Sequence, residues 1–198
     1  IARTADDCGW DNIQVADAPF FPEEISVPYP YTPDGTRFWP LDMPVLDPWV
    51  AITAMAVVTR RIRFLPSVLR LAIRQPLLEA KSLFSVAAIS NDRVALGVGL
   101  AWMPEEFRWL GVDMKTRGAR QDEAIQVIRL LMQGGMQEFH GKHFDFDRLP
   151  VRSPPTHVMA QCARSCTRDA AHGCVGLAAE FERLQRERAE TFAVRVEQ

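Results

Sequence analysis

The sequence predicts an α/β protein built on a parallel sheet or barrel. Strand-like and helical segments alternate along the chain, which is the order of strands joined by right-handed helical crossovers. The segment 94–98 is a short apolar run without strict alternation, as expected for a parallel strand covered on both faces. Polar residues gather where the predicted strands end. The expected strands are 10–16, 62–71 and 94–98, and the expected helices are 48–58, 77–90 and 117–132.

Near the N-terminus, helical spacing over the first eight residues stops at Gly9, which indicates the end of a helix. The short strand that follows finishes at Asp17, so this carboxylate lies where a strand meets its loop. Asp17 is a candidate ligand residue, and a loop cap is the structural alternative.

The segment from Pro19 to Pro48 contains eight prolines interleaved with aromatic residues. Proline at this density excludes a helix or a central strand. The aromatic residues favour an ordered loop that folds over something apolar. A lid over a ligand and a surface excursion with aromatic anchors are both consistent with this pattern.

The second predicted strand is interrupted by Pro66, which indicates a bulge or an irregular backbone. The third ends in Gly97 and Gly99, whose lack of a Cβ lets a backbone approach a flat or phosphorylated ligand, although two such glycines can equally form a tight turn. Ligands of parallel α/β folds lie at the carboxyl ends of the strands. We therefore expect Asp17, residues 67–74 and residues 97–106 at one mouth.

After Phe107 we expect a polar connection over 111–116, then the clearest amphipathic helix of the chain and a hairpin over 138–146. The hairpin carries His140 and His143, which could face each other if Gly141 and Lys142 form the turn. No third His or Cys is near them in sequence, so structural roles are favoured. Toward the C-terminus we expect a charged helix over 180–190 and a strand over 192–196.

The composition favours a small-molecule partner. A net charge of −2 and a pI near 6.1 provide no basic face for nucleic acid. No apolar run approaches a membrane span, and the first residues lack the order of a signal peptide, so the cytoplasm is expected. No metal site is predicted, and the cysteines are expected to be reduced, unligated thiols; they are Cys8, Cys162, Cys166 and Cys174.

Several motifs occur in an order that resembles a known family. They are GWDNIQVAD at 9–17, RQP at 74–76, LGVGLAWMPEEF at 96–107, RGARQDE at 117–123 and FHGKHFDF at 139–146. Together they resemble the bacterial luciferase-like flavin and deazaflavin oxidoreductases over residues 1 to about 156.

The resemblance implies a TIM (β/α)8 barrel of the luciferase-like type, incomplete at both ends, as one domain over 1–198. It also implies a homodimer and an oxidoreductase or monooxygenase that acts on a small organic substrate. The loop at 29–35 is most similar to that of members that use coenzyme F-420, with FMN as the alternative. The resemblance further implies a bulge with a non-proline cis peptide at Ser67–Val68. The cofactor-binding residues implied are Asp17, Ser67, Val68, Arg74, Gly97, Val98 and Gly99. Arg74 could meet an anionic group, and a surface ion pair is its structural alternative.

The chain also departs from the family pattern. Ala18 replaces a histidine, Leu65-Pro66 replaces glycines before the bulge, and Ala101-Trp102 stands where some members place an acidic residue, so no catalytic residue is assigned. The stretch 158–177 lacks most of the family's glycine-rich phosphate seat. These departures leave an alternative function, a catalytically inactive barrel fragment that serves as a binding or dimerisation module.

Overall fold

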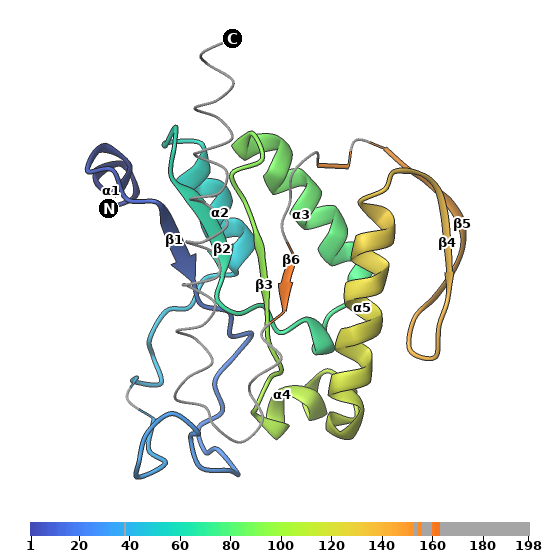
Figure 1. Cartoon of the computed structure of the whole chain (residues 1–198). Coiled ribbons are helices and arrows are strands. Elements are labelled where there is room, and N and C mark those ends of the chain that lie inside the picture. The colour runs from blue at the N-terminus through green and yellow to red at the C-terminus, as the bar shows by residue number, and fades with distance from the viewer. Residues whose placement is uncertain (38, 153, 156–159, 163–198) are drawn as a thin grey trace. The chain divides into compact units, whose positions relative to one another are not determined.

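Four short parallel strands form the centre of the computed structural model (Figure 1). The structure describes residues 1–37, 39–152, 154–155 and 160–162, all within the compact unit Ile1–Cys162. Strand β1 (Asn12–Val15) pairs with β2 (Arg63–Pro66), and β3 (Leu96–Val98) pairs with β6 (Ala160–Cys162). Isolated parallel bridges, Phe64 to Val94 and Leu69 to Val98, join β2 to β3. The α/β prediction is confirmed, but the described residues do not close a barrel.

The strand predicted over 62–71 is shorter than expected, because β2 ends at Pro66. The chain then forms a bulge that contains a cis peptide bond between Ser67 and Val68, at the position that the family resemblance implies. It rejoins the neighbouring strand when the Leu69 amide donates to the Gly97 carbonyl at 2.8 Å. A 3-10 helix, Leu71–Ile73, follows. Proline lacks an amide hydrogen, so Pro66 cannot donate to the ladder that the longer strand requires.

The three helices predicted between the strands are present, at α2 (Pro48–Ala56), α3 (Pro76–Ser90) and α5 (Arg117–Leu131). The N-terminal helix α1 covers Ala2–Asp7. Two further elements were not predicted from the sequence, the helix α4 (Pro104–Trp109) and the 3-10 helix Met114–Thr116. Helix α4 is only six residues long, too short for a periodic apolar pattern, although proline begins it and two glutamates follow in its first turn.

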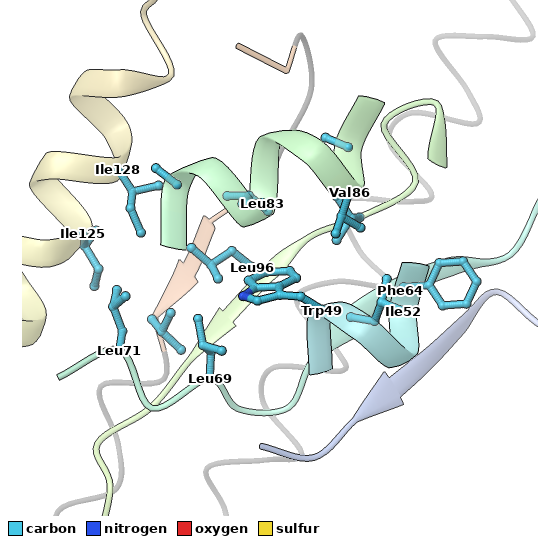
Figure 2. Packing of buried hydrophobic residues seen from close by; sticks show 14 of the residues in the cluster. Trp49, Ile52, Phe64, Leu69, Leu71, Leu83, Val86, Leu96, Ile125 and Ile128 are labelled. Carbon is cyan, nitrogen blue, oxygen red and sulfur yellow. The ribbon is translucent and has the colours of Figure 1, made fainter. Parts of the chain in front are cut away.

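Helices α2, α3 and α5 bury one apolar core against the strands (Figure 2). Trp49 and Ile52 from α2 meet Leu83 and Val86 from α3, while α5 adds Ile128. This burial of aliphatic and aromatic side chains is the main stabilising contribution to the fold. None of the helices in the described part of the chain combines the length and apolar character that crossing a membrane would need.

Arg93 stabilises the end of the sheet opposite the strand carboxyl termini. Its Nη2 donates to the carbonyl of Ala56 at 2.8 Å, and its Nη1 donates to the carbonyl of Ile62 at 2.9 Å. Its Nε donates to the carbonyl of Ser90 at 2.7 Å, and Thr59 accepts two further bonds. One guanidinium therefore joins the end of α2, the start of β2 and the end of α3.

The predicted hairpin consists of β4 (Gly135–His140) and β5 (Asp145–Val151), with a register shift between Gln137 and Phe139. His140 lies opposite Asp145, and its Nδ1 is 2.8 Å from the Asp145 carboxylate. The expectation that His140 could face His143 is therefore wrong, because the turn extends through residue 144. The amide of His143 instead donates to the carboxylate of Glu123 at 2.8 Å. The elements predicted over 180–190 and 192–196, most of 158–177, Cys166 and Cys174 lie outside the described residues.

Candidate functional site

The carboxyl ends of β1, β2 and β3 meet at one edge, where the long loop 16–47 and α4 also lie (Figure 1). Asp17 follows β1, and its Oδ2 accepts from the Arg70 amide at 2.9 Å. The Gly99 amide donates to the Leu69 carbonyl at 3.1 Å. The structure thus brings together the three predicted segments, because carboxyl ends of parallel strands share an edge.

Gly97 in β3 and Gly99 directly after it make room for the bulge. A Cβ built on Gly97 would lie 2.4 Å from the carbonyl oxygen of Pro66, and one on Gly99 would lie 2.4 Å from the Val68 Cγ2. Both glycines are buried, whereas Ser67 is exposed and Val68 is half-buried. The surface offered to a ligand at this place is therefore the bulge itself, and direct ligand contact by the glycines stays a prediction. Their neighbour Val98, also a predicted contact, lies in the core with 1% exposure.

Arg74 is held by carboxylates from three segments. Its Nη2 lies 2.7 Å from Oδ1 of Asp17 and 3.8 Å from Oδ2 of Asp47, and its Nη1 lies 3.1 Å from Oε1 of Glu79. The second Glu79 oxygen accepts from Trp49 Nε1 at 2.8 Å. Burial would lower the pKa of Arg74, but the negative charges of Asp17 and Glu79 raise it above its usual value. Asp17 thus bonds the Arg70 amide and the Arg74 side chain, as its structural alternative allows, and its contact with a ligand stays a prediction.

Arg70 and Glu106 form a second, largely buried pair, which the sequence did not predict. Arg70 Nη1 lies 2.9 Å from Glu106 Oε1, and the two side chains are 12% and 0% exposed. Burial raises the pKa of Glu106 to about 7; Arg70 and Arg74 oppose this shift, while Asp17 and Glu105 add to it. A buried carboxyl that titrates near neutrality is typical of functional sites. The one signal in the sequence was the Glu105-Glu106 pair directly after Pro104.

The proline-rich loop is ordered and docks at the strand ends through its aromatic residues. The Tyr29 ring lies 5.3 Å from the ring of Trp102 and 4.7 Å from that of Trp39. The Ser26 amide donates to Oε1 of Glu105 at 3.0 Å. Burial alone would raise the pKa of Glu105, but the bonds from Ser26 lower it below its usual value. The anchoring function is thus present, and whether the loop also moves as a lid stays a prediction.

The family model for luciferase-like monooxygenases matches residues 1–196. The chain belongs to this family. Uncharacterized proteins of Mycobacterium bovis and Mycobacterium tuberculosis are 38% identical to this luciferase-like chain over 156 residues, covering 79% of it and 54% of each relative. The chain thus spans about half the length of the curated relatives it matches.

Solved structures support the fold of this luciferase-like chain. A monooxygenase from Streptomyces bottropensis superposes with a TM-score of 0.61 at 24% identity, covering 80% of this chain and 44% of that one. The oxygenating constituent of 3,6-diketocamphane monooxygenase from Pseudomonas putida, in complex with FMN, superposes with a TM-score of 0.62 at 18% identity. The match covers 81% of this chain and 42% of that one. An F-420-dependent secondary alcohol dehydrogenase in complex with an F-420–acetone adduct superposes with a TM-score of 0.63 at 20% identity. The match covers 81% of this chain and 46% of that one.

Proposed function

We propose that the protein is a flavin- or deazaflavin-dependent oxidoreductase or monooxygenase that acts on a small organic substrate. The observation that carries this proposal is the bulge at Ser67–Val68, which presents a half-buried apolar side chain beside the carboxyl end of β3. Family membership and the FMN and F-420 complexes among the solved relatives support the same cofactor classes. These solved structures contain either FMN or F-420 and do not decide between the two cofactors. The similarity of the loop at 29–35 to F-420-using members keeps F-420 our first choice and FMN the alternative.

The residues at the strand ends fit the face of a flat ring. Val68 supplies an apolar surface, and Ser67 is exposed next to it. Asp17 supports this surface indirectly, because its carboxylate accepts hydrogen bonds from the Arg70 amide and the Arg74 guanidinium and holds both in place. A bound reduced flavin or deazaflavin would supply the hydride or the electrons that activate oxygen, while the protein orients it and excludes water.

The loop that covers the strand ends fits the second of these tasks. Tyr29 packs on Trp102, and Ser26 is hydrogen-bonded to Glu105, so the loop is fixed to the segment that follows β3. A cover of aromatic side chains lowers the local dielectric and favours an apolar substrate. We infer that the substrate is small and largely apolar.

The cofactor proposal is tested by incubating the protein separately with F-420 and with FMN, then measuring the absorbance that remains after desalting. We expect one of the two to be retained, and Val68→Ala to weaken retention because the apolar contact is shortened. Val58→Ala, at an exposed position beyond α2, is the matched control and should leave retention unchanged. Retention of neither cofactor would contradict the proposal and favour the inactive binding or dimerisation module.

We also propose that the protein forms a homodimer through the outer faces of α2 and α3. These helices expose Val50 and Leu78 at 65% and 67%, beside Val57 at 64%. Exposed aliphatic side chains gathered on neighbouring helices are typical of subunit interfaces. Size-exclusion chromatography with light scattering should give twice the chain mass, and Leu78→Asp should shift the protein to a monomer. A monomeric wild type at micromolar concentration would refute this proposal.

A further inference from the structure

Two arginines lie at the carboxyl ends of the strands, and their charges are balanced very differently. Arg74 has three carboxylates within 4 Å, from Asp17, Glu79 and Asp47. Among the residues that the structure describes, Arg70 has one, from Glu106. A guanidinium that is already surrounded by carboxylates gains little from another anion, so Arg74 is poorly suited to the anionic group that the sequence analysis assigned to it.

The single partner of Arg70 is itself poorly satisfied. Glu106 is 0% exposed, and among the described residues neither of its carboxylate oxygens finds a hydrogen-bond donor. Arg70 Nη1 approaches to 2.9 Å but likewise has no aligned hydrogen-bond acceptor in that part of the chain. Ions that are close but not hydrogen-bonded recover little of the free energy that burial costs them, so this pair is easily exchanged for a better one.

The position of Arg70 also suits ligand binding. It follows the bulge by two residues, and Asp17 fixes its backbone amide at 2.9 Å. Its side chain retains 12% exposure, whereas that of Glu106 has none. A planar guanidinium on a fixed backbone can bind a carboxylate or phosphate through two parallel hydrogen bonds.

We propose that Arg70 binds an oxyanion of the cofactor or substrate, and that Glu106 is the partner that Arg70 exchanges for it. The inference rests on the proposed function for the identity of the ligand. The shared chemistry is a phosphate or carboxylate oxygen, which a phosphorylated flavin or an acidic substrate would supply.

The exchange makes binding depend on pH. The charged groups that act on Glu106 are Arg70, Arg74, Asp17 and Glu105. With the pKa of Glu106 at about 7, this carboxyl is mostly neutral at pH 6 and mostly ionised at pH 8, so Arg70 is left without its counter-charge at the lower pH. When the pH rises from 6 to 8, the fraction of protein in which Arg70 is free to bind an oxyanion falls from about nine-tenths to about one-tenth. The apparent affinity for the oxyanion then falls about tenfold.

Four probes test the proposal by isothermal titration at pH 6 and pH 8: FMN, riboflavin, benzoate and inorganic phosphate. Riboflavin differs from FMN by the phosphate alone, so this pair reports a cofactor oxyanion, and benzoate reports a substrate carboxylate. We expect Arg70→Gln to weaken binding of FMN or benzoate roughly tenfold to a hundredfold, with riboflavin unchanged. Arg70→Lys should restore part of the loss, and Arg129→Gln, an exposed arginine on α5, should have no effect.

Glu106→Gln mimics the neutral acid and provides the second variant. It should bind the responsive probe about tenfold more tightly than the wild type at pH 8 and equally at pH 6. Because the two proteins are compared with the same probe at the same pH, titration of the probe's own phosphate cancels. Equal binding of all probes to wild type and Arg70→Gln would overturn the inference even if riboflavin binds. If no flavin binds but benzoate or phosphate depends on Arg70, the inference holds and the proposed cofactor function fails.

Discussion

Replacing Glu106 by glutamine is expected to remove a pH-dependent loss of stability. The ordinary pKa of glutamate is 4.5, and burial raises that of Glu106 to about 7. The folded state therefore holds this proton more tightly than the unfolded state does. The free energy of unfolding falls as pH rises from about 4.5 to about 7 and is level above, which is the sign for a carboxyl whose folded pKa is raised.

The magnitude follows from the same two values. A tenfold change in proton affinity corresponds to about 1.4 kcal/mol, so the rise from 4.5 to about 7 amounts to roughly 3 kcal/mol in total. Most of this loss, roughly 2–3 kcal/mol, falls between pH 5 and pH 8. Relative to the wild type, the Glu106→Gln variant should become more stable by that amount over the interval, because glutamine does not ionise. Urea denaturation at both pH values measures the difference.

Glu105 provides a matched control in the next residue. Its pKa is lowered, because the hydrogen bonds from Ser26 outweigh its burial. Its contribution to stability is present above the ordinary pKa and is lost as pH falls through the folded value. Glu105→Gln should therefore weaken the protein at pH 8 and matter progressively less in acid. Parallel pH profiles for wild type and Glu106→Gln would refute the assignment of a buried neutral carboxyl.

Three further predictions concern stability and local order. Gly97→Ala should lower the free energy of unfolding by about 1–3 kcal/mol, because the new methyl meets the Pro66 carbonyl at 2.4 Å. Gly118→Ala, in open space on α5, should instead raise that free energy by about 0.5–1 kcal/mol. Urea denaturation measures both changes. Arg93→Ala should cost about 2–4 kcal/mol in thermal unfolding, because buried carbonyls of three elements lose their donor. Glu123→Gln should speed hydrogen exchange at the hairpin turn, whose three consecutive amides donate to this carboxylate, and unchanged protection there would contradict the assignment.

The sequence predicted the strand and helix order because each long element carries a periodic apolar pattern or a clear start. Asp47-Pro48 is an example, since the Asp47 side chain does accept from the amides of Trp49 and Val50, at 2.9 and 3.2 Å. The bulge was also foreseen, because Pro66 announces a break in the ladder. Helix α4 was not, since six residues give no periodicity to detect.

The site was predicted as a place more accurately than as a set of contacts. Asp17 and Arg74 do lie at the strand ends, but they neutralise each other across 57 positions of sequence, which no local pattern reveals. The pair of Arg70 and Glu106 could not be predicted for the same reason, because the two residues are 36 positions apart in the sequence. Gly97 and Gly99 were predicted to let the backbone approach a ligand, which stays a prediction. What approaches them is the neighbouring bulge, which only the tertiary structure can show.

The two adjacent glutamates of α4 connect the loop to the strand ends. Glu105 accepts from Ser26 of the loop, whereas Glu106 lies beside Arg70, which follows the bulge after β2. Phe107 holds the helix in place, because it is 1% exposed and packs with Ala72. The Ser26 bond ties the loop to the helix that carries Glu106. Hydration of that carboxyl would return its pKa toward the ordinary value and strengthen its charge opposite Arg70. The neutral form of Glu106 that burial favours therefore leaves Arg70 available for the proposed oxyanion.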